Sequence, residues 1–176
     1  MKKIILGTVA SIITASSIMA ATVNIDGGLK FGTGQMIASS ETTNATDSAT
    51  QTFDVGLDID FKLGKNLKMG FGFASHIPTT DSKDSIELGA LNETHLKLGF
   101  IVDKDILLYV GGHYGIQNID DGVDDLSYHG SGVSYGATFD FKRHSAFDVS
   151  YTNYTLSNED KNMDVDLLTV SYVLKF

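Results

Sequence analysis

The chain has 176 residues, no cysteine, one proline and 18 glycines, and its 22 acidic residues against 13 basic ones give a formal net charge of −9 at pH 7. The lack of cysteine excludes a disulfide framework and a thiolate site. The acidic balance argues against a nucleic-acid partner, because phosphate recognition needs Lys and Arg. The length fits one domain.

The N-terminal 21 residues have the pattern of a secretory signal peptide. Lys2 and Lys3 give a basic start, an apolar segment follows, and small residues allow cleavage after Ala20 or Ala21. A helical membrane anchor would need about 20 predominantly apolar residues, and several Ser and Thr interrupt this segment. We therefore expect a signal peptide over residues 1–21 and an exported domain over residues 22–176.

Eight segments of the exported domain alternate apolar and polar residues with a period of two, which predicts β-strands. In the clearest one, every second residue from Phe53 to Leu63 is apolar. This period excludes an amphipathic helix, whose apolar positions recur three or four residues apart. In the seventh segment the apolar phase changes at Asn153 and Tyr154, which predicts a β-bulge. The predicted strands cover residues 22–37, 52–63, 67–77, 93–102, 106–117, 128–141, 146–156 and 165–176.

The connections between the predicted strands alternate between short and long. Short periplasmic turns and longer extracellular loops are typical of outer-membrane barrels. An even strand number also permits an up-and-down barrel that leaves no unpaired edge in lipid. The fold class is therefore all-β, an eight-stranded antiparallel up-and-down transmembrane β-barrel; a secreted sandwich or lipocalin-like barrel is the competing fold. Tight turns are predicted at 64–66, 103–105 and 142–145, and longer polar loops at 39–50, 78–92, 120–125 and 157–162.

The last segment ends the chain on an aromatic residue. Leu168, Val170, Tyr172, Leu174 and Phe176 form an unbroken apolar set at every second position. Alternate residues of a strand face opposite sides, so this set predicts an apolar face that runs to the terminal carboxyl group.

This ending, together with GVSYG at 132–136 and AFDVSY at 146–151, resembles the small eight-stranded outer-membrane barrels: OmpX/Ail-type proteins, the OmpA transmembrane domain and the opacity-like "porin family" barrels. The resemblance covers essentially the whole exported domain. It implies the outer membrane of a Gram-negative bacterium, contact with outer-membrane lipid and lipopolysaccharide, and recognition of Tyr172, Leu174 and Phe176 by the barrel assembly machinery. The family includes adhesins, serum-resistance factors, structural proteins and lipid-modifying enzymes, so these motifs specify architecture and not function.

The polar face of the strands is predicted to line the barrel, and it carries charges of both signs. In eight-stranded barrels side chains fill the interior, and unpaired buried charges are costly, so we expect mutual ion pairs that form a polar plug. A narrow conductance is the alternative. The inward charged residues are Asp26, Lys30, Asp58, Asp60, Lys62, Lys68, Lys97, Asp140, Asp148 and Lys175.

Strand pairing predicts the neighbours of five histidine and carboxylate residues. Antiparallel pairing about the turn that follows the fourth strand places His95 opposite His113, with Glu93 two residues away, and His76 is predicted opposite Asp54. Two imidazoles and a carboxylate can bind a metal ion. Hydrogen-bonded interior histidines are the alternative, and no metal ligand is assigned.

One pair of residues resembles part of an enzyme site. His129 and Ser131 lie on one strand face near the predicted outer leaflet, and they resemble part of the lipid A deacylase site built on a similar barrel, in which His is the general base and Ser the nucleophile. The Asn that follows the Ser in that family is Gly132 here, and no matching Glu is found. His144 and Ser145 form a weaker pair in a predicted turn.

The sequence therefore predicts an integral outer-membrane barrel with a structural and surface-interaction, adhesin-like role and a polar-plugged interior. An extracellular ligand would bind through the loops. The alternatives are a lipid A-modifying hydrolase that uses His129 and Ser131, or a small channel. No catalytic or cofactor-binding residue and no cofactor is assigned. A cation-binding or solvated acidic loop is predicted from Asp120, Asp121, Asp124 and Asp125.

Overall fold

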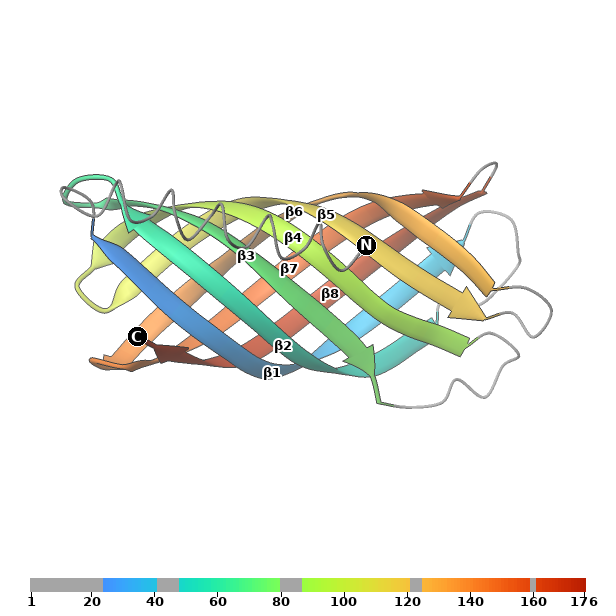
Figure 1. Ribbon diagram of the computed structural model, residues 1–176, viewed down its shortest axis with the longest axis horizontal. Coiled ribbons are helices and arrows are strands. Elements are labelled where there is room, and N and C mark those ends of the chain that lie inside the picture. The colour runs from blue at the N-terminus through green and yellow to red at the C-terminus, as the bar shows by residue number, and fades with distance from the viewer. Residues whose placement is uncertain (1–23, 41–47, 80–86, 121–124, 159–160) are drawn as a thin grey trace, which may run out of the picture.

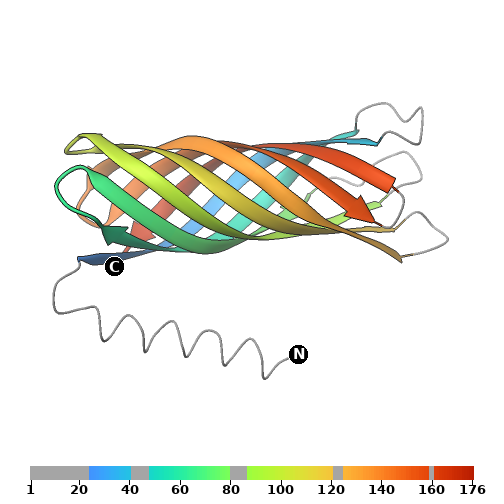
Figure 2. The same ribbon diagram turned by 90° about the horizontal axis from the view of Figure 1, so that it is seen from above.

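A computed structural model describes residues 24–40, 48–79, 87–120, 125–158 and 161–176. Eight antiparallel strands close into a barrel in which each strand pairs with its neighbours along the chain and β1 pairs with β8 (Figure 1). The strands cross the barrel axis at a marked tilt (Figure 2). They are β1 (Ile25–Ser40), β2 (Ser48–Lys62), β3 (Leu67–Pro78), β4 (Glu87–Asp103), β5 (Ile106–Asp120), β6 (Asp125–Lys142), β7 (Ser145–Asn158) and β8 (Lys161–Lys175).

The predicted strand number, order and antiparallel pairing are confirmed. Within the described ranges, we find no helix whose length and apolar character would let it span a membrane. The predicted signal peptide lies outside the described residues and stays a prediction.

Seven of the eight strands are longer than predicted, so the connections at one end are shorter. The strands have 12 to 18 residues, whereas the alternation predicted segments close to the 9–11 that cross a bilayer. Residues 157–162, predicted as a loop, are mostly paired, because Asn158 faces Lys161 and Ser157 faces Asn162. Residues 87–92 likewise belong to β4. The polar composition of these segments predicts loops, but a strand that continues beyond lipid needs no apolar face.

Two ends of the barrel can be distinguished by their connections. The turn end holds residues 63–66, 104–105 and 143–144 together with the C-terminus, and the loop end holds residues 41–47, 79–86, 121–124 and 159–160. The predicted alternation of short and long connections is correct for the first two connections at the loop end. It is wrong for the last two, because β5 and β6 are joined by four residues, as β2 and β3 are, and β7 and β8 by two.

The predicted β-bulge at Asn153 and Tyr154 is wrong. β7 pairs with β8 without a shift along its whole length, and Tyr154 points inward and is fully buried. The apolar phase changes there because the interior itself becomes apolar. Register shifts within the described strands occur instead at Leu88/Leu91, Ile101/Asp103 and Asp140/Lys142.

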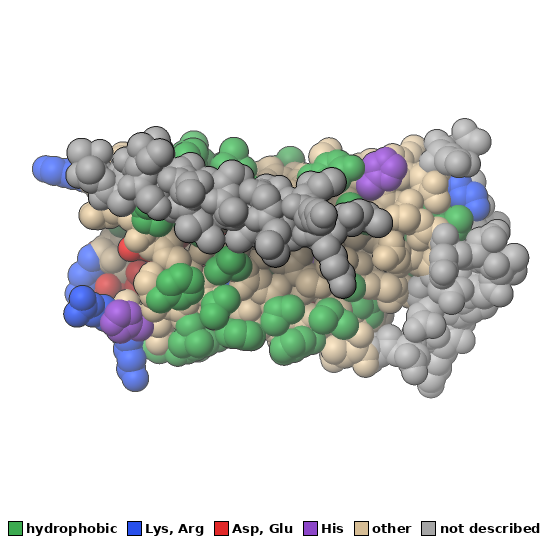
Figure 3. All heavy atoms as spheres, viewed as in Figure 1, with side chains coloured by type: hydrophobic (Ala, Val, Ile, Leu, Met, Phe, Trp, Pro, Cys, Tyr) green, Lys and Arg blue, Asp and Glu red, His purple; other side chains and the backbone are tan. Residues whose placement is uncertain are grey.

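The outer wall carries an apolar belt. Side chains that alternate with the inward set are exposed and large, and Figure 3 shows them between a charged turn end and the loop end. Aromatic rings gather near the turn end, where Phe141 stacks on Phe147 with ring centroids 5.0 Å apart and Tyr172 packs against both. Such interfacial aromatic residues are typical of transmembrane barrels. The belt includes Leu29, Phe31, Leu96, Leu98, Phe100, Val110, Val133, Tyr135, Phe139, Val170 and Leu174.

Towards the loop end, the same outward positions become polar. On β8, Leu168 is followed in this direction by Asp166 and Asp164, and these carboxylates accept hydrogen bonds from Asn153 (2.8 Å) and Thr155 (3.0 Å) of β7. We call this polar extension of the outer wall the collar. Its outward members are Gln35, Gln51, Asn92, Asn118, Ser127, His129, Ser131, Asn153, Thr155, Asn162, Asp164 and Asp166.

Candidate functional site

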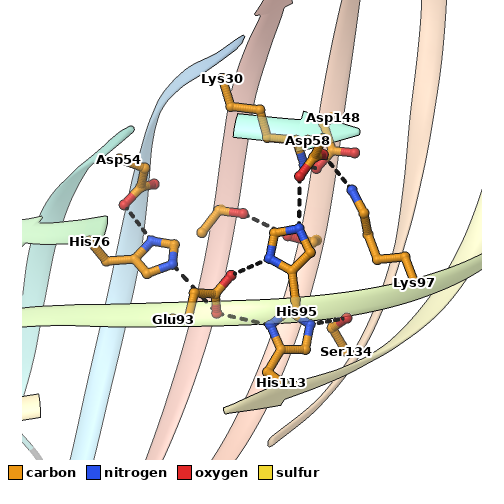
Figure 4. Close-up of polar contacts among 12 residues, drawn as sticks. Lys30, Asp54, Asp58, His76, Glu93, His95, Lys97, His113, Ser134 and Asp148 are labelled. Atoms are coloured by element: carbon orange, nitrogen blue, oxygen red, sulfur yellow. Dashed lines mark hydrogen bonds and ion pairs between the residues drawn. The ribbon is translucent and has the colours of Figure 1, made fainter. Parts of the chain in front are cut away.

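The barrel interior contains a connected network of ionisable side chains, as the inward charges predicted. Lys30 Nζ lies 3.0 Å from Asp58 Oδ2 and 3.0 Å from Asp148 Oδ1, and Lys97 forms an ion pair with Asp58 (Figure 4). Tyr109 donates a hydrogen bond to Asp148 Oδ1 (2.9 Å). Each carboxylate thus has a cation or a donor, which offsets the cost of burying its charge.

Nearer the turn end, the remaining predicted charges form a more exposed layer. Lys68 pairs with Asp26 at 2.9 Å and approaches Asp60 at 4.0 Å, and Lys175 pairs with Asp140. These residues line a cavity of about 390 Å³. Lys62 also lines this cavity, and it is exposed.

On the loop-end side of the lysine network, three histidines surround one carboxylate. Strand pairing places His95 opposite His113 and Asp54 opposite His76, so both predicted pairings are confirmed. A two-residue turn with a bulge at Ile101/Asp103 leads to the same register as the predicted three-residue turn.

Glu93 is the centre of this group. His95 Nδ1 lies 3.0 Å from Glu93 Oε1, His113 Nδ1 lies 2.9 Å from Oε2, and His76 Nε2 lies 3.8 Å from the same Oε2 (Figure 4). The Glu93, His95 and His76 side chains are 4–6% exposed, so solvent does little to screen the carboxylate. We call Glu93, His76, His95 and His113 the histidine cluster.

Glycine on the neighbouring strand makes room for this arrangement. A Cβ at Gly72 would collide with Asp58 Oδ1 and with His95 Nε2, which are 2.7 Å from each other. A Cβ at Gly111 would lie 2.7 Å from Ser134 Oγ and 3.1 Å from His113 Nε2. Gly72 and Gly111 are therefore small residues on a crowded inner wall.

Between the histidine cluster and the loop end, the interior is mostly apolar, a feature that the sequence did not predict. Tyr154, Met36, Leu91 and Leu156 are fully buried, and the Tyr154 ring packs edge-on against His113 with centroids 5.8 Å apart. Six members occupy inward positions inside the predicted strands, and the same parity continued past the strand ends would have added Leu91, Ile119 and Met163. The apolar cluster consists of Met36, Leu88, Leu91, Ile119, Tyr128, Tyr154, Leu156, Met163, Val165 and Leu167.

The predicted hydrolase pair lies on the outer wall. His129 and Ser131 are exposed on one face of β6, as predicted, and both belong to the collar. No hydrogen bond joins the His129 ring to Ser131 within the described part of the chain. Of the weaker pair, His144 is exposed at the turn end, whereas Ser145 is buried and its hydroxyl is bonded to Tyr172 Oη (2.8 Å).

The acidic segment near residue 120 is a short connection and not a long loop. The backbones of Asp120 and Asp125 face each other as the last residues of β5 and the first of β6. Asp121 and Asp124 lie outside the described residues, so cation binding there remains a prediction.

Comparison with known proteins agrees with this architecture. No curated protein sequence matches the chain. Neisserial surface protein A (NspA) has a similar solved structure: the TM-score is 0.60 at 13% identity over 88% of this chain and 99% of that one. The attachment invasion locus protein Ail of Yersinia pestis has a TM-score of 0.58 at 15% identity over 86% of this chain and 98% of that one. These likenesses concern the fold.

An apolar outer belt, a closed eight-stranded barrel and a buried polar interior define a transmembrane β-barrel of the outer-membrane class. A family model described as "Outer membrane protein beta-barrel domain" matches residues 8–176. The chain belongs to this outer-membrane β-barrel family, and it is an outer-membrane protein of the Gram-negative type.

Proposed function

We propose that this protein has a structural and surface-interaction, adhesin-like role, with its loop end outside the cell and its lumen closed to solutes. The collar carries the proposal, because β7 and β8 continue as a paired hairpin beyond the apolar belt and bear exposed polar side chains. The names of two proteins of similar fold agree with this role: NspA is a surface protein, and Ail is an attachment invasion locus protein. A further structure of the latter contains the heparin analogue sucrose octasulfate.

Surface interaction can be tested by changing one end of the barrel at a time. Cells that display a variant with residues 41–47 and 80–86 replaced by Gly/Ser linkers of equal length should adhere to host-cell monolayers no better than cells without the protein. Replacement of residues 64–66 at the turn end should leave adhesion unchanged. Protease added to intact cells should cut at 41–47 and spare 64–66; cleavage at 64–66 would reverse the orientation.

The closed lumen is supported by the interior packing. The ten members of the apolar cluster are at most 9% exposed, and aqueous channels come with about 16–18 strands, not eight. We expect the purified protein to give no stable conductance steps in planar bilayers under conditions in which a known porin conducts. Large steps proportional to salt concentration would instead support a channel.

Assembly is proposed to depend on the closing strand and on export by residues 1–21. Phe176 is 72% exposed, and its backbone N–H and C=O exchange hydrogen bonds of 3.0 Å with Gly27. Deletion of Phe176 should leave unfolded protein in the periplasm, because the outward set that includes Tyr172 and Leu174 then lacks its last member. The measurement is the heat-modifiable band on a gel of outer membranes. An Ala substitution at Lys175, which points inward, is the matched control and should assemble.

The alternative function, a lipid A-modifying hydrolase, predicts a different result. If His129 and Ser131 acted on lipid A, a lipid A acyl chain lost in cells with the protein would return with Ser131→Ala. We expect the lipid A mass spectrum to be the same with and without the protein, because Ser131 has no hydrogen bond to an activating base within the described residues.

A further inference from the structure

We propose that the histidine cluster binds one divalent transition-metal ion, of the Zn²⁺ type, inside the barrel. Glu93, His95 and His113 each offer a ligand atom, and these atoms all lie within 4.8 Å of one another. Imidazole nitrogen with a carboxylate oxygen is a donor set that suits Zn²⁺, Co²⁺ and Ni²⁺ rather than Ca²⁺ or Mg²⁺.

The spacing of the ligand atoms fits a four-coordinate ion. Metal–ligand bonds of about 2.0–2.2 Å in a tetrahedral site place neighbouring ligand atoms about 3.3–3.6 Å apart. The nitrogens of His95, His113 and His76 lie 3.0, 2.9 and 3.8 Å from the Glu93 carboxylate oxygens. The ligand atoms of Glu93, His95 and His113 already lie within 4.8 Å of one another, and rotation of the His76 side chain towards Glu93 would supply the fourth ligand.

His76 supplies independent evidence that the cluster lacks a component. Its Nε2 is buried, has no hydrogen-bond partner among the described residues, and is directed at Glu93 Oε2 at 3.8 Å (Figure 4). Buried polar atoms of native proteins nearly always have a partner. A metal ion held beside Glu93 would be that partner.

The other ring nitrogen of each histidine is already held in the way that metal-binding histidines are held. His95 Nε2 bonds to Asp58 (2.7 Å), His76 Nδ1 to Asp54 (2.9 Å) and His113 Nε2 to Ser134 Oγ (2.6 Å). Such outer contacts fix the tautomer and aim the free lone pair at the metal. When a metal ion is bound, the protonated nitrogens of His95 and His76 would face the two aspartates. Their other nitrogens, which lie 3.0 and 3.8 Å from the Glu93 carboxylate oxygens, would then turn their lone pairs to the ion.

The charge of the connected network favours a divalent cation. Its four carboxylates exceed its two lysines, which leaves a net formal charge of −2 when the imidazoles are neutral, and one divalent ion balances this charge. The charged members are Asp54, Asp58, Glu93 and Asp148 with Lys30 and Lys97. The cluster borders a cavity of about 40 Å³, which exceeds the about 10–15 Å³ that a cavity needs in order to hold one water molecule.

The test is a metal titration of the purified, folded, EDTA-treated barrel. Co²⁺ should bind with one equivalent and give the visible absorption of a four-coordinate ion, and Zn²⁺ should displace it. His113→Ala and Glu93→Gln should weaken binding more than about 100-fold, since changes to outer contacts alone cost about 10–100-fold. Ser134→Ala should fall in that smaller range. His129→Ala and His144→Ala remove exposed histidines and are the matched controls, which should bind as the wild type does.

Folding is checked on the same samples through the heat-modifiable gel band. If His113→Ala does not fold, Glu93→Gln and His76→Ala replace it, and Zn²⁺ should raise the Tm of the wild type but not of Glu93→Gln. Folded wild-type protein that gives no Co²⁺ absorption would overturn the proposal. Binding that is lost in His129→Ala or His144→Ala, and kept in Glu93→Gln, would also overturn it in favour of surface binding.

Discussion

Replacing Asp58 with alanine is expected to lower the free energy of unfolding by about 3–5 kcal/mol, the cost of leaving a buried charge without its partner. Asp58 faces two lysines, and for Lys97 it is the ion-pair partner within the described structure. Lys30 keeps Asp148 after the substitution, so the penalty falls mainly on Lys97. Urea unfolding in phospholipid vesicles, followed by gel mobility, measures the change.

A double variant separates the lost charge pair from lost packing. Asp58→Ala combined with Lys97→Met removes both charges and should recover most of the stability, because an apolar replacement of a buried pair is often neutral. Asp140→Ala breaks the pair with Lys175 in the more exposed layer at the turn end and should cost at most about 1 kcal/mol. A double variant as unstable as Asp58→Ala would show that the charge pair is not the cause.

Replacing Tyr154 with alanine is expected to cost about 3–5 kcal/mol, as large-to-small changes at buried aromatic residues do. Tyr154 is fully buried in the apolar cluster and packs on the His113 ring. The cavity left behind would border Gly115 and Gly132, because a Cβ at these positions would lie 3.2 and 2.6 Å from the Tyr154 ring. The same urea unfolding measures the loss.

The control for Tyr154 is a tyrosine on the other face of the wall. Tyr135 is 59% exposed on the apolar belt, so Tyr135→Ala exchanges contacts with lipid and should cost less. Equal losses for the two variants would contradict the view that the apolar cluster is a packed core.

The period-two pattern predicted the barrel because one face of each strand must meet lipid and the other the interior. Where both demands apply, as from Phe53 to Phe61, alternation is strict. Beyond the apolar belt the outer face meets water, so the alternation weakens or inverts, as at Tyr154 and Leu156, which point inward beside outward Asn153 and Thr155. The sequence alone therefore placed the strand ends too close to the membrane centre.

The sequence predicted which residues of the candidate site face each other on adjacent strands, but not that these pairs meet around Glu93. Register relates residues on adjacent strands, and so His95 with His113 and Asp54 with His76 were correct. The approach of His76 to Glu93, and of Asp58 to His95, joins residues that are not register partners. That approach depends on how far the side chains reach along the inner wall and on the space left by Gly72. Neither of these follows from strand register.

The collar raises the loop end of the barrel above the bilayer. From Leu168 to Asn162, six residues at about 3.3 Å each extend about 20 Å along β8, which a tilt of about 40° reduces to about 15 Å along the membrane normal. The headgroup layer on one side is about 5–8 Å thick. The β7–β8 hairpin therefore carries hydrogen-bonded backbone clear of the headgroups. Any partner that docked on it would meet backbone that is already ordered by pairing and would lose little conformational entropy on binding.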